Sequence, residues 1–379
     1  MSTYKSLYLA AIVTIVLAGA TLLPGADSID GFMYVGSLDQ KLLVINEADG
    51  EVVAEIPLGG IPRTTVSAAE PSQLHIVTTQ LQFETVDLAA RKVTRSFSLS
   101  DGRSSPRLVR GGGRTFSGLA VDPGGRYVYA TMEAAIKEID HFRIEPPVFV
   151  TIDLEEQRIS KSTPFPKGYD QGFGFAATYK LSPDGQKLYV FDDDIVVFDV
   201  AALKELDRIP LAKPPYPGAS PYRLTASDDP NDAPGIVTSV FTSADPIVHK
   251  ETLGLATLNL ATGTVDYRPF GPAFPMVGFA LSPDRKVGYS LMITRAGANR
   301  ETEWWVWDID SAKVIRRAPV PARPNFRFGV SSDGSKLFVY GSGSTIEFYD
   351  AETLKAVKML YLNKDTTTNL ITLPGKAKS

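Results

Sequence analysis

The chain has 379 residues, of which 44% are apolar and 22% charged, a composition that excludes disordered and collagen-like proteins. Its 39 basic and 43 acidic residues give a net charge of −4, which argues against nucleic acid as a partner. Cysteine is absent and histidine occurs three times, so the sequence predicts no disulfide, no thiolate or His-built metal site and no c-type haem attachment.

The N-terminal segment has the form of an export signal. Lys5 precedes the apolar run Leu7 to Leu17, and Ala18-Gly19-Ala20 is a small-x-small cleavage site. We therefore expect residues 1–20 to be a signal peptide and the mature chain to be periplasmic, without stable membrane insertion. Alternatively, the run from Leu7 to Leu23 could stay uncut as a short membrane anchor.

The first structural unit shows only three strands before the chain moves on. The pattern predicts strands at Phe32–Gly36, Lys41–Asn46 and Glu51–Leu58. A fourth strand for this unit has a candidate at the far end of the chain, Thr367–Leu373. Residues 27–376 would then form one closed domain, because the C-terminal strand completes the first unit and leaves no open edge.

One four-stranded unit recurs after that start. Two strands joined by an Asp-Gly type turn lead to a third strand that ends at an Asp or Asn, and a tight turn and a fourth strand follow. The clearest copies are Tyr179–Leu211 and Phe328–Leu360. The third-strand markers recur about every 40 to 50 residues plus insertions, as in propeller blades; they are Asn46, Asp87, Asp153, Asp199, Asn259, Asp308 and Asp350.

These observations predict an all-β fold, a seven-bladed β-propeller whose ring is closed by the C-terminal strand. Two β-sandwiches are the alternative, but they do not account for one unit copied seven times. If the strands of a blade are lettered a to d outward, the b–c and d–a connections share one face of the disc. The long connections all fall there, which marks that face as the interaction surface; they are Leu99–Thr115, Ala134–Pro147, Pro164–Gly172, Lys213–Pro221, Ser243–Thr252 and Thr294–Glu303.

Aromatic residues recur near the start of the innermost strands. We expect several of them to ring the mouth of the central channel, facing a substrate cavity or a partner, with packing between blades as the alternative; they are Phe116, Phe173, Phe175, Tyr222, Phe274 and Phe326. His141, inside a long b–c connection, is a further candidate, for which a structural role is the alternative.

Two other clusters have structural interpretations. In the run EWWVWD we expect Trp305 to face opposite to Trp304 and Trp307, packing between blades. The acidic run Asp192 to Asp194 could bind calcium but is better explained as a hairpin turn. No nucleophile elbow, zincin motif or P-loop is present, so no catalytic residue, cofactor site or metal site is predicted in this chain.

Three segments resemble a known family. The SPDG-type pieces are similar to YVTN propellers in general. The segments IDHFRIEPPVFVTIDLEEQ (Ile139–Gln157), Gly235–Val265 and Val314–Lys355 are similar to the β subunit of periplasmic quinohemoprotein amine dehydrogenases, and more distantly to the methylamine dehydrogenase heavy chain. The resemblance implies a seven-bladed propeller without a cofactor of its own.

The resemblance also implies partners. In that family the propeller packs against a dihaem cytochrome c subunit and a small subunit that carries a cysteine-derived tryptophylquinone, and it helps to wall the substrate cavity. The implied role is that of a scaffold in the oxidative deamination of primary amines. A stand-alone exported propeller that binds a protein or another ligand is the alternative, and a metal-dependent propeller hydrolase is a third.

Overall fold

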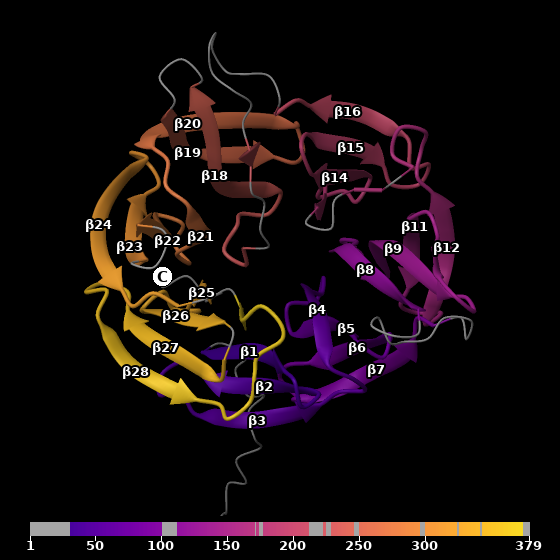
Figure 1. Ribbon diagram of the computed structural model, residues 1–379, viewed down its shortest axis with the longest axis horizontal. Coiled ribbons are helices and arrows are strands. Elements are labelled where there is room, and N and C mark those ends of the chain that lie inside the picture. The colour runs from indigo at the N-terminus through magenta and orange to yellow at the C-terminus, as the bar shows by residue number, and fades with distance from the viewer. Residues whose placement is uncertain are drawn as a thin grey trace, which may run out of the picture.

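Seven antiparallel sheets are arranged around one axis in the computed structural model, which confirms the predicted all-β, seven-bladed propeller (Figure 1). The structure describes residues 31–100, 112–170, 172–173, 177–211, 223–224, 229–245, 250–295, 300–323, 326–341 and 343–373. The predicted signal peptide, residues 1–20, lies outside these ranges. Within them, no helix is long and apolar enough to cross a membrane.

Each blade is ordered from its innermost strand outward. Blade 1 is built of β29 (Ile371–Thr372), β1 (Phe32–Ser37), β2 (Lys41–Asn46) and β3 (Val52–Pro57). Blade 2 has β4 (Pro62–Ser67), β5 (Gln73–Thr78), β6 (Gln82–Asp87) and β7 (Lys92–Ser98). Blade 3 has β8 (Gly112–Val121), β9 (Tyr127–Lys137), β11 (Val148–Asp153) and β12 (Arg158–Pro164), with β10 (Phe142–Ile144) also paired to β9.

The remaining four blades follow the same order. Blade 4 has β13 (Thr178–Leu181), β14 (Lys187–Phe191), β15 (Ile195–Asp199) and β16 (Glu205–Ile209). Blade 5 has β17 (Arg223–Leu224), β18 (Ile236–Asp245), β19 (Lys250–Asn259) and β20 (Thr264–Pro272). Blade 6 has β21 (Met276–Leu281), β22 (Val287–Arg295), β23 (Glu301–Asp308) and β24 (Lys313–Val320). Blade 7 has β25 (Phe326–Val330), β26 (Lys336–Gly341), β27 (Thr345–Asp350) and β28 (Ala356–Tyr361).

The third strand of every blade ends at its predicted Asp or Asn marker. The marker side chain accepts backbone N–H bonds in the next turn, as Asp199 Oδ1 does from Ala202 at 2.7 Å. The fourth residue after each marker then has a positive φ. Two of these residues are glycines and five are not, so five turns hold a side chain in the left-handed region; the seven are Gly50, Arg91, Gln157, Leu203, Gly263, Ala312 and Leu354.

The C-terminal segment closes the ring as predicted. Strand β29 pairs with β1 through Met33 opposite Thr372 and Tyr34 opposite Ile371. The hydroxyl of Thr368 accepts the Gly36 N–H at 2.8 Å. In Figure 1 the yellow chain that follows β28 therefore passes beside the indigo β1. Closure therefore joins the first and last described strands in one sheet, and β29 covers the inner edge of β1.

Seven apolar clusters fill the seven seams between neighbouring blades. They arise because strand residues alternate between the two faces of a blade, and both faces are covered. The three tryptophans follow this rule, which corrects the predicted orientation. Trp304 lies in the seam between blades 6 and 7, whereas Trp305 and Trp307, two residues apart, share the seam between blades 5 and 6.

Candidate functional site

Blade 3 carries a three-stranded extension. Strand β9 continues beyond the blade to Lys137, with β8 on one side and β10 on the other. Ala135, for example, pairs with Gly113 of β8 and with Ile144 of β10. Half of the connection Ala134–Pro147, expected as a loop, is therefore strand. An extended ladder of this kind is far better defined than a surface loop, because its backbone groups are paired.

The tip of this extension, residues 138–145, carries both charged side chains and exposed apolar ones. The Arg143 guanidinium joins Glu138 at 2.9 Å and Glu145 at 3.0 Å, bracing both sides of the turn. His141 is exposed, and its Nδ1 lies 2.7 Å from a carboxylate oxygen of Asp140. Two isoleucines project among these charges, Ile139 at 103% and Ile144 at 69% exposure. Exposed large apolar side chains on a braced hairpin are typical of a surface that a partner covers.

The b–c hairpins of blades 5 and 6 are also longer than the others. Strands β18 and β19 pair as far as Asp245 opposite Lys250, and β22 and β23 as far as Arg295 opposite Glu301. The last pair is joined by a salt bridge of 2.7 Å. The predicted loops Ser243–Thr252 and Thr294–Glu303 are thus partly strand. All three extended hairpins are b–c connections. They therefore lie on the face of the disc that the sequence analysis predicted to be the interaction surface.

Two of the six predicted aromatic residues belong to the seams between blades. The side chain of Phe116 is buried in the seam between blades 2 and 3, and that of Phe173 in the seam between blades 3 and 4. Phe173 makes edge contacts with Phe165 and Phe198. This is the packing that the sequence left as the alternative. The partner-facing role of the six residues stays a prediction, because Phe175 and Tyr222 lie outside the described residues, as does the side chain of Phe326 in β25.

Phe274 stands apart because it is 37% exposed. Its ring meets Trp305 edge to face at 5.6 Å, and the Arg317 guanidinium covers the same tryptophan at 3.9 Å from the ring centroid. Glu303 accepts the Trp305 indole N–H at 3.0 Å. Phe274, on the d–a linker between blades 5 and 6, therefore packs on a tryptophan whose indole N–H and ring face are both already in contact with other side chains. The EWWVWD run was the sequence signal for this cluster, although its orientation was mispredicted.

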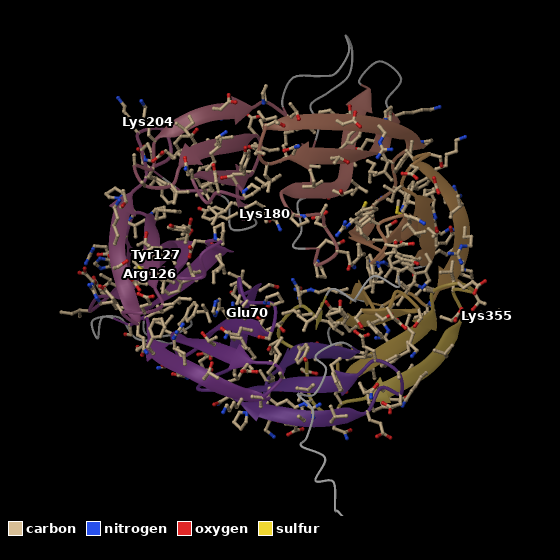
Figure 2. All side chains as sticks on the ribbon, turned by 180° about the vertical axis from the view of Figure 1, so that it is seen from behind. Glu70, Arg126, Tyr127, Lys180, Lys204 and Lys355 are labelled. Carbon is tan, nitrogen blue, oxygen red and sulfur yellow. The ribbon has the colours of Figure 1, made fainter. Side chains whose placement is uncertain are left out.

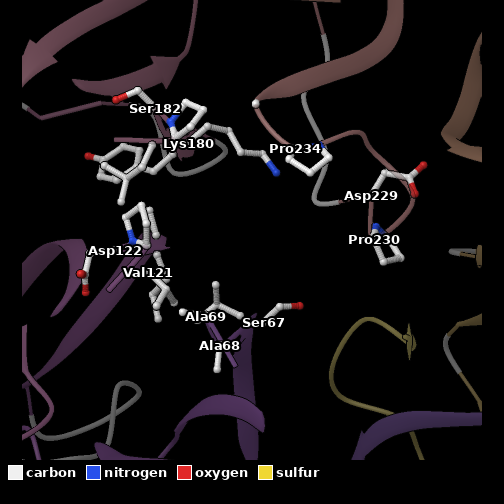
Figure 3. Close-up of a pocket in the computed structure, with 18 residues that line it drawn as sticks. Ser67, Ala68, Ala69, Val121, Asp122, Lys180, Ser182, Asp229, Pro230 and Pro234 are labelled. Atoms are coloured by element: carbon white, nitrogen blue, oxygen red, sulfur yellow. The ribbon is translucent and has the colours of Figure 1, made fainter. Parts of the chain in front are cut away.

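A pocket of about 490 Å³ opens at the opposite end of the strands. Its described walls are the ends of β4, β8 and β13 with the turns that follow them, and the loop before β18, so four blades contribute (Figure 3). The three charged lining residues are Asp122, Lys180 and Asp229. Figure 3 shows the Lys180 ammonium extending into the open space, while the carboxylates of Asp122 and Asp229 turn away from it.

The two aspartates are engaged in holding turns. Asp122 accepts the N–H groups of Gly124, at 2.9 Å, and Tyr127. Asp229 accepts those of Asn231 at 2.9 Å and Leu281 at 2.6 Å, which ties the loop of blade 5 to blade 6. Burial raises the pKa of Asp229, an effect that these backbone bonds and the charge of Lys180 oppose. The sequence did not reveal this pocket, because strand ends from four blades meet there.

Metal-binding geometry is not found among the described residues: no three His, Asp or Glu side chains lie close enough to hold an ion. The Asp192 to Asp194 run connects β14 and β15, as the turn interpretation predicted. There Asp194 accepts the Leu211 N–H at 2.9 Å and pairs with Arg208 at 3.4 Å.

Comparison with known proteins supports the fold but identifies no family or function. No family model and no curated protein matches the chain. A functionally unknown protein from Desulfotomaculum acetoxidans superimposes with a TM-score of 0.52 and 11% identity, covering 92% of this chain and 100% of the other. Apo AztD from Citrobacter koseri gives 0.51 and 11%, covering 88% and 96%. The dihydro-heme d1 dehydrogenase NirN, in complex with DHE, gives 0.49 and 15%, covering 90% and 75%. The chain is therefore a seven-bladed β-propeller with distant propeller neighbours.

Proposed function

We propose that this chain is the propeller subunit of a periplasmic quinohemoprotein amine dehydrogenase and has no cofactor of its own. In that complex it would hold a small quinone-bearing subunit and a dihaem cytochrome c subunit, and wall part of the cavity in which primary amines are oxidised. The segment Ile139–Gln157, which resembles that family, contains most of the exposed tip of blade 3.

One observation carries the proposal: Ile139 and Ile144 are exposed on a hairpin that ion pairs hold in shape. A hairpin without a partner gains nothing by presenting two isoleucines to water, since burying each would contribute roughly 1.5–3 kcal/mol. A preformed tip also loses little conformational entropy when a partner covers it. Docking of a companion subunit accounts for both features.

The composition assigns the chemistry to the companions. A cysteine-derived quinone and c-type haem attachment both require cysteine, and this chain has none. Its residues would therefore position partners and exclude water from their shared cavity, while electrons pass between groups held by other chains.

The test is to recover the tagged mature chain from the periplasm of its native host and stain the eluate for haem and for quinone. The double variant Ile139→Asp/Ile144→Asp puts charge at the proposed contact. Leu206→Asp is the matched control, because Leu206 is 51% exposed on β16 at the outer rim of blade 4.

We expect a haem-positive and a quinone-positive band with the wild-type chain and with Leu206→Asp, and neither band with the hairpin variant. Recovery of the wild-type propeller alone would overturn the amine dehydrogenase role in favour of a stand-alone binding module. Bands that survive the hairpin substitutions would overturn the docking surface but keep the role.

A further inference from the structure

The outer rim of the ring differs in charge from blade to blade. The outer strand of blade 4, β16, carries Glu205 and Asp207, and that of blade 1, β3, carries Glu55. The outer strands of blades 6 and 7, β24 and β28, have no acidic residue. They follow one another along the edge of the disc, and we call their outward surface the blade 6–7 rim (Figure 1). It is basic although the whole chain has a net charge of −4; its four strand cations are Lys313, Arg316, Arg317 and Lys358.

Large apolar side chains are exposed beside these cations. Val357, Met359 and Tyr361 lie at every second position of β28 and are between 42% and 67% exposed. Strand alternation puts them on one side of the strand, because Leu360 packs in the seam with blade 1. Ile315 on β24 is also exposed. No other described outer strand exposes three large apolar side chains, and such a row is typical of a surface that something covers.

Contacts with neighbouring blades hold the rim in shape. The Arg316 guanidinium donates to the carbonyl oxygens of Ala351, at 3.3 Å, and of Glu352 in blade 7. The Lys358 ammonium donates to the carbonyl oxygen of Asp49 in blade 1. Because these acceptors are uncharged carbonyl groups, the bonds fix the two side chains without cancelling their charge.

The other cations of the rim reach solvent. Lys313 and Arg317 are exposed on β24, and the exposed Lys355 directly precedes β28. Figure 2 shows Lys355 at the outer edge of the disc. The acidic residues that precede the two strands, Asp310 and Glu352, lie in the turns. Along the strands themselves the rim therefore presents only positive charge and apolar surface.

The described chain starts at the same part of the ring. The Gly31 N–H donates to the Ser332 hydroxyl of blade 7 at 3.0 Å. Residues 24–30 separate Gly31 from the apolar run Leu7–Leu23, and a chain of that length spans at most about 25 Å. The alternative in which the run stays uncut as an anchor would therefore hold blade 7 close to a bilayer.

We propose that the blade 6–7 rim binds the surface of an anionic phospholipid bilayer. The cations would lie at the lipid phosphates, and the apolar row would enter the boundary between headgroups and acyl chains. Tyrosine is one of the side chains that favour this boundary. The outer edge of a disc is convex, a shape that suits an extended surface better than a small ligand. This surface is independent of the companion role proposed above, which concerns the b–c hairpin of blade 3.

The experiment is co-sedimentation of the purified mature chain, which lacks the apolar run, with two kinds of vesicle. One is pure phosphatidylcholine, and the other contains one-third phosphatidylglycerol. Each is measured in about 0.1 M and in about 1 M salt, which shortens the screening length from about 10 Å to about 3 Å. Analytical ultracentrifugation without vesicles reports self-association, and polyglutamate as a competitor represents an acidic protein.

Two double variants separate the charge from the apolar row. Lys313→Glu/Lys355→Glu reverses two exposed charges, and Met359→Asp/Tyr361→Asp puts charge into the row. Thermal unfolding of each variant checks that the propeller is intact. The controls make the same kinds of change on the rim of blade 4, far from Lys355 in Figure 2; they are Lys204→Glu and Leu206→Asp.

We expect the wild-type chain to sediment with the anionic vesicles in low salt and not with phosphatidylcholine alone. Binding should be at least about tenfold weaker in high salt and in both double variants, and unchanged in the two controls. Absence of binding, equal binding to both vesicles, or binding that neither double variant weakens would overturn the proposal. So would a dimer abolished by Met359→Asp/Tyr361→Asp, or capture of polyglutamate, in a chain that ignores vesicles. The lipid and salt comparisons need no variant, so they decide the case even if one variant fails to fold.

Discussion

Glu47 is the most informative single residue for the stability of the ring. It follows the third-strand marker of blade 1, and the equivalent position in the other six blades is apolar; those residues are Leu88, Leu154, Val200, Leu260, Ile309 and Ala351. Glu47 is only 4% exposed and lies at the seam between blades 7 and 1. There it accepts the N–H of Ser332 at 2.9 Å and the Ser332 hydroxyl at 2.7 Å.

Ser332 stands where three other blades have proline. These equivalents, in blades 3, 4 and 6, are Pro123, Pro183 and Pro283, which have no N–H to satisfy. At the seam between blades 7 and 1, a carboxylate therefore replaces the apolar residue of the other six blades, and a serine replaces the proline of these three. Burial raises the pKa of Glu47 from 4.5 to about 6, and the bonds from Ser332 only partly oppose that rise.

This raised pKa predicts a defined pH dependence. Between pH 6 and 4.5 the folded chain takes up a proton at Glu47 before the unfolded chain does, so acidification stabilises the fold through this residue. The rise in pKa corresponds to about 2 kcal/mol of folding free energy. Glu47→Gln removes the charge and keeps the shape. We expect it to be more stable than wild type by about 2 kcal/mol at pH 7.5, and equal to it near pH 4.

The assay is urea unfolding of both proteins across pH 4 to 8, with Glu51→Gln as control because Glu51 is an exposed carboxylate of the same blade. Effects of other titrating groups cancel in the difference between variants. A Glu47→Gln variant that is less stable than wild type at pH 7.5, with the gap vanishing on acidification, would show that the pKa is lowered. That result would refute the reasoning.

Three further predictions follow from buried or strained positions. His75 is buried beside Thr85, and burial lowers its pKa from 6.5 to about 4. The stability that the neutral imidazole gives the fold is therefore complete above pH 6.5 and is lost as the pH falls toward 4. His75→Phe should abolish about 3 kcal/mol of this acid destabilisation, which urea unfolding at pH 4.5 and 7.5 measures. Gly118→Ala should destabilise the fold by about 2–3 kcal/mol, because φ is +62° and a Cβ would lie 2.8 Å from the buried Tyr179 ring; an unchanged melting temperature would contradict this. Gln157→Gly should stabilise the fold by up to about 1 kcal/mol in chemical unfolding, since Gln157 has φ +54° where two other blades use glycine; a loss of stability would show that its strain is negligible.

Much of the architecture could be predicted because each blade repeats local chemistry. An Asp or Asn that can accept turn N–H groups ends the third strand in all seven blades, and this signal needs no tertiary information. The closing strand was predictable because blade 1 was short of one strand. The orientation of Trp305 was mispredicted, although simple alternation places residues two apart on the same face.

The candidate sites were harder to predict, for physical reasons. The long b–c connections pointed to the end of the strands where the extended hairpins lie, but the sequence did not show that the ladders continue into them, as with Ala135 between Gly113 and Ile144. The pocket near Lys180 depends on where four blades bring their strand ends, and no local pattern encodes that. Glu47 left a signal that was readable: a charged residue where six equivalent positions are apolar.

The two candidate surfaces occupy opposite ends of the same strands. The exposed isoleucines lie at the end where b–c hairpins turn, and the Lys180 pocket lies where a–b turns meet. A partner on the hairpins would therefore leave the pocket open.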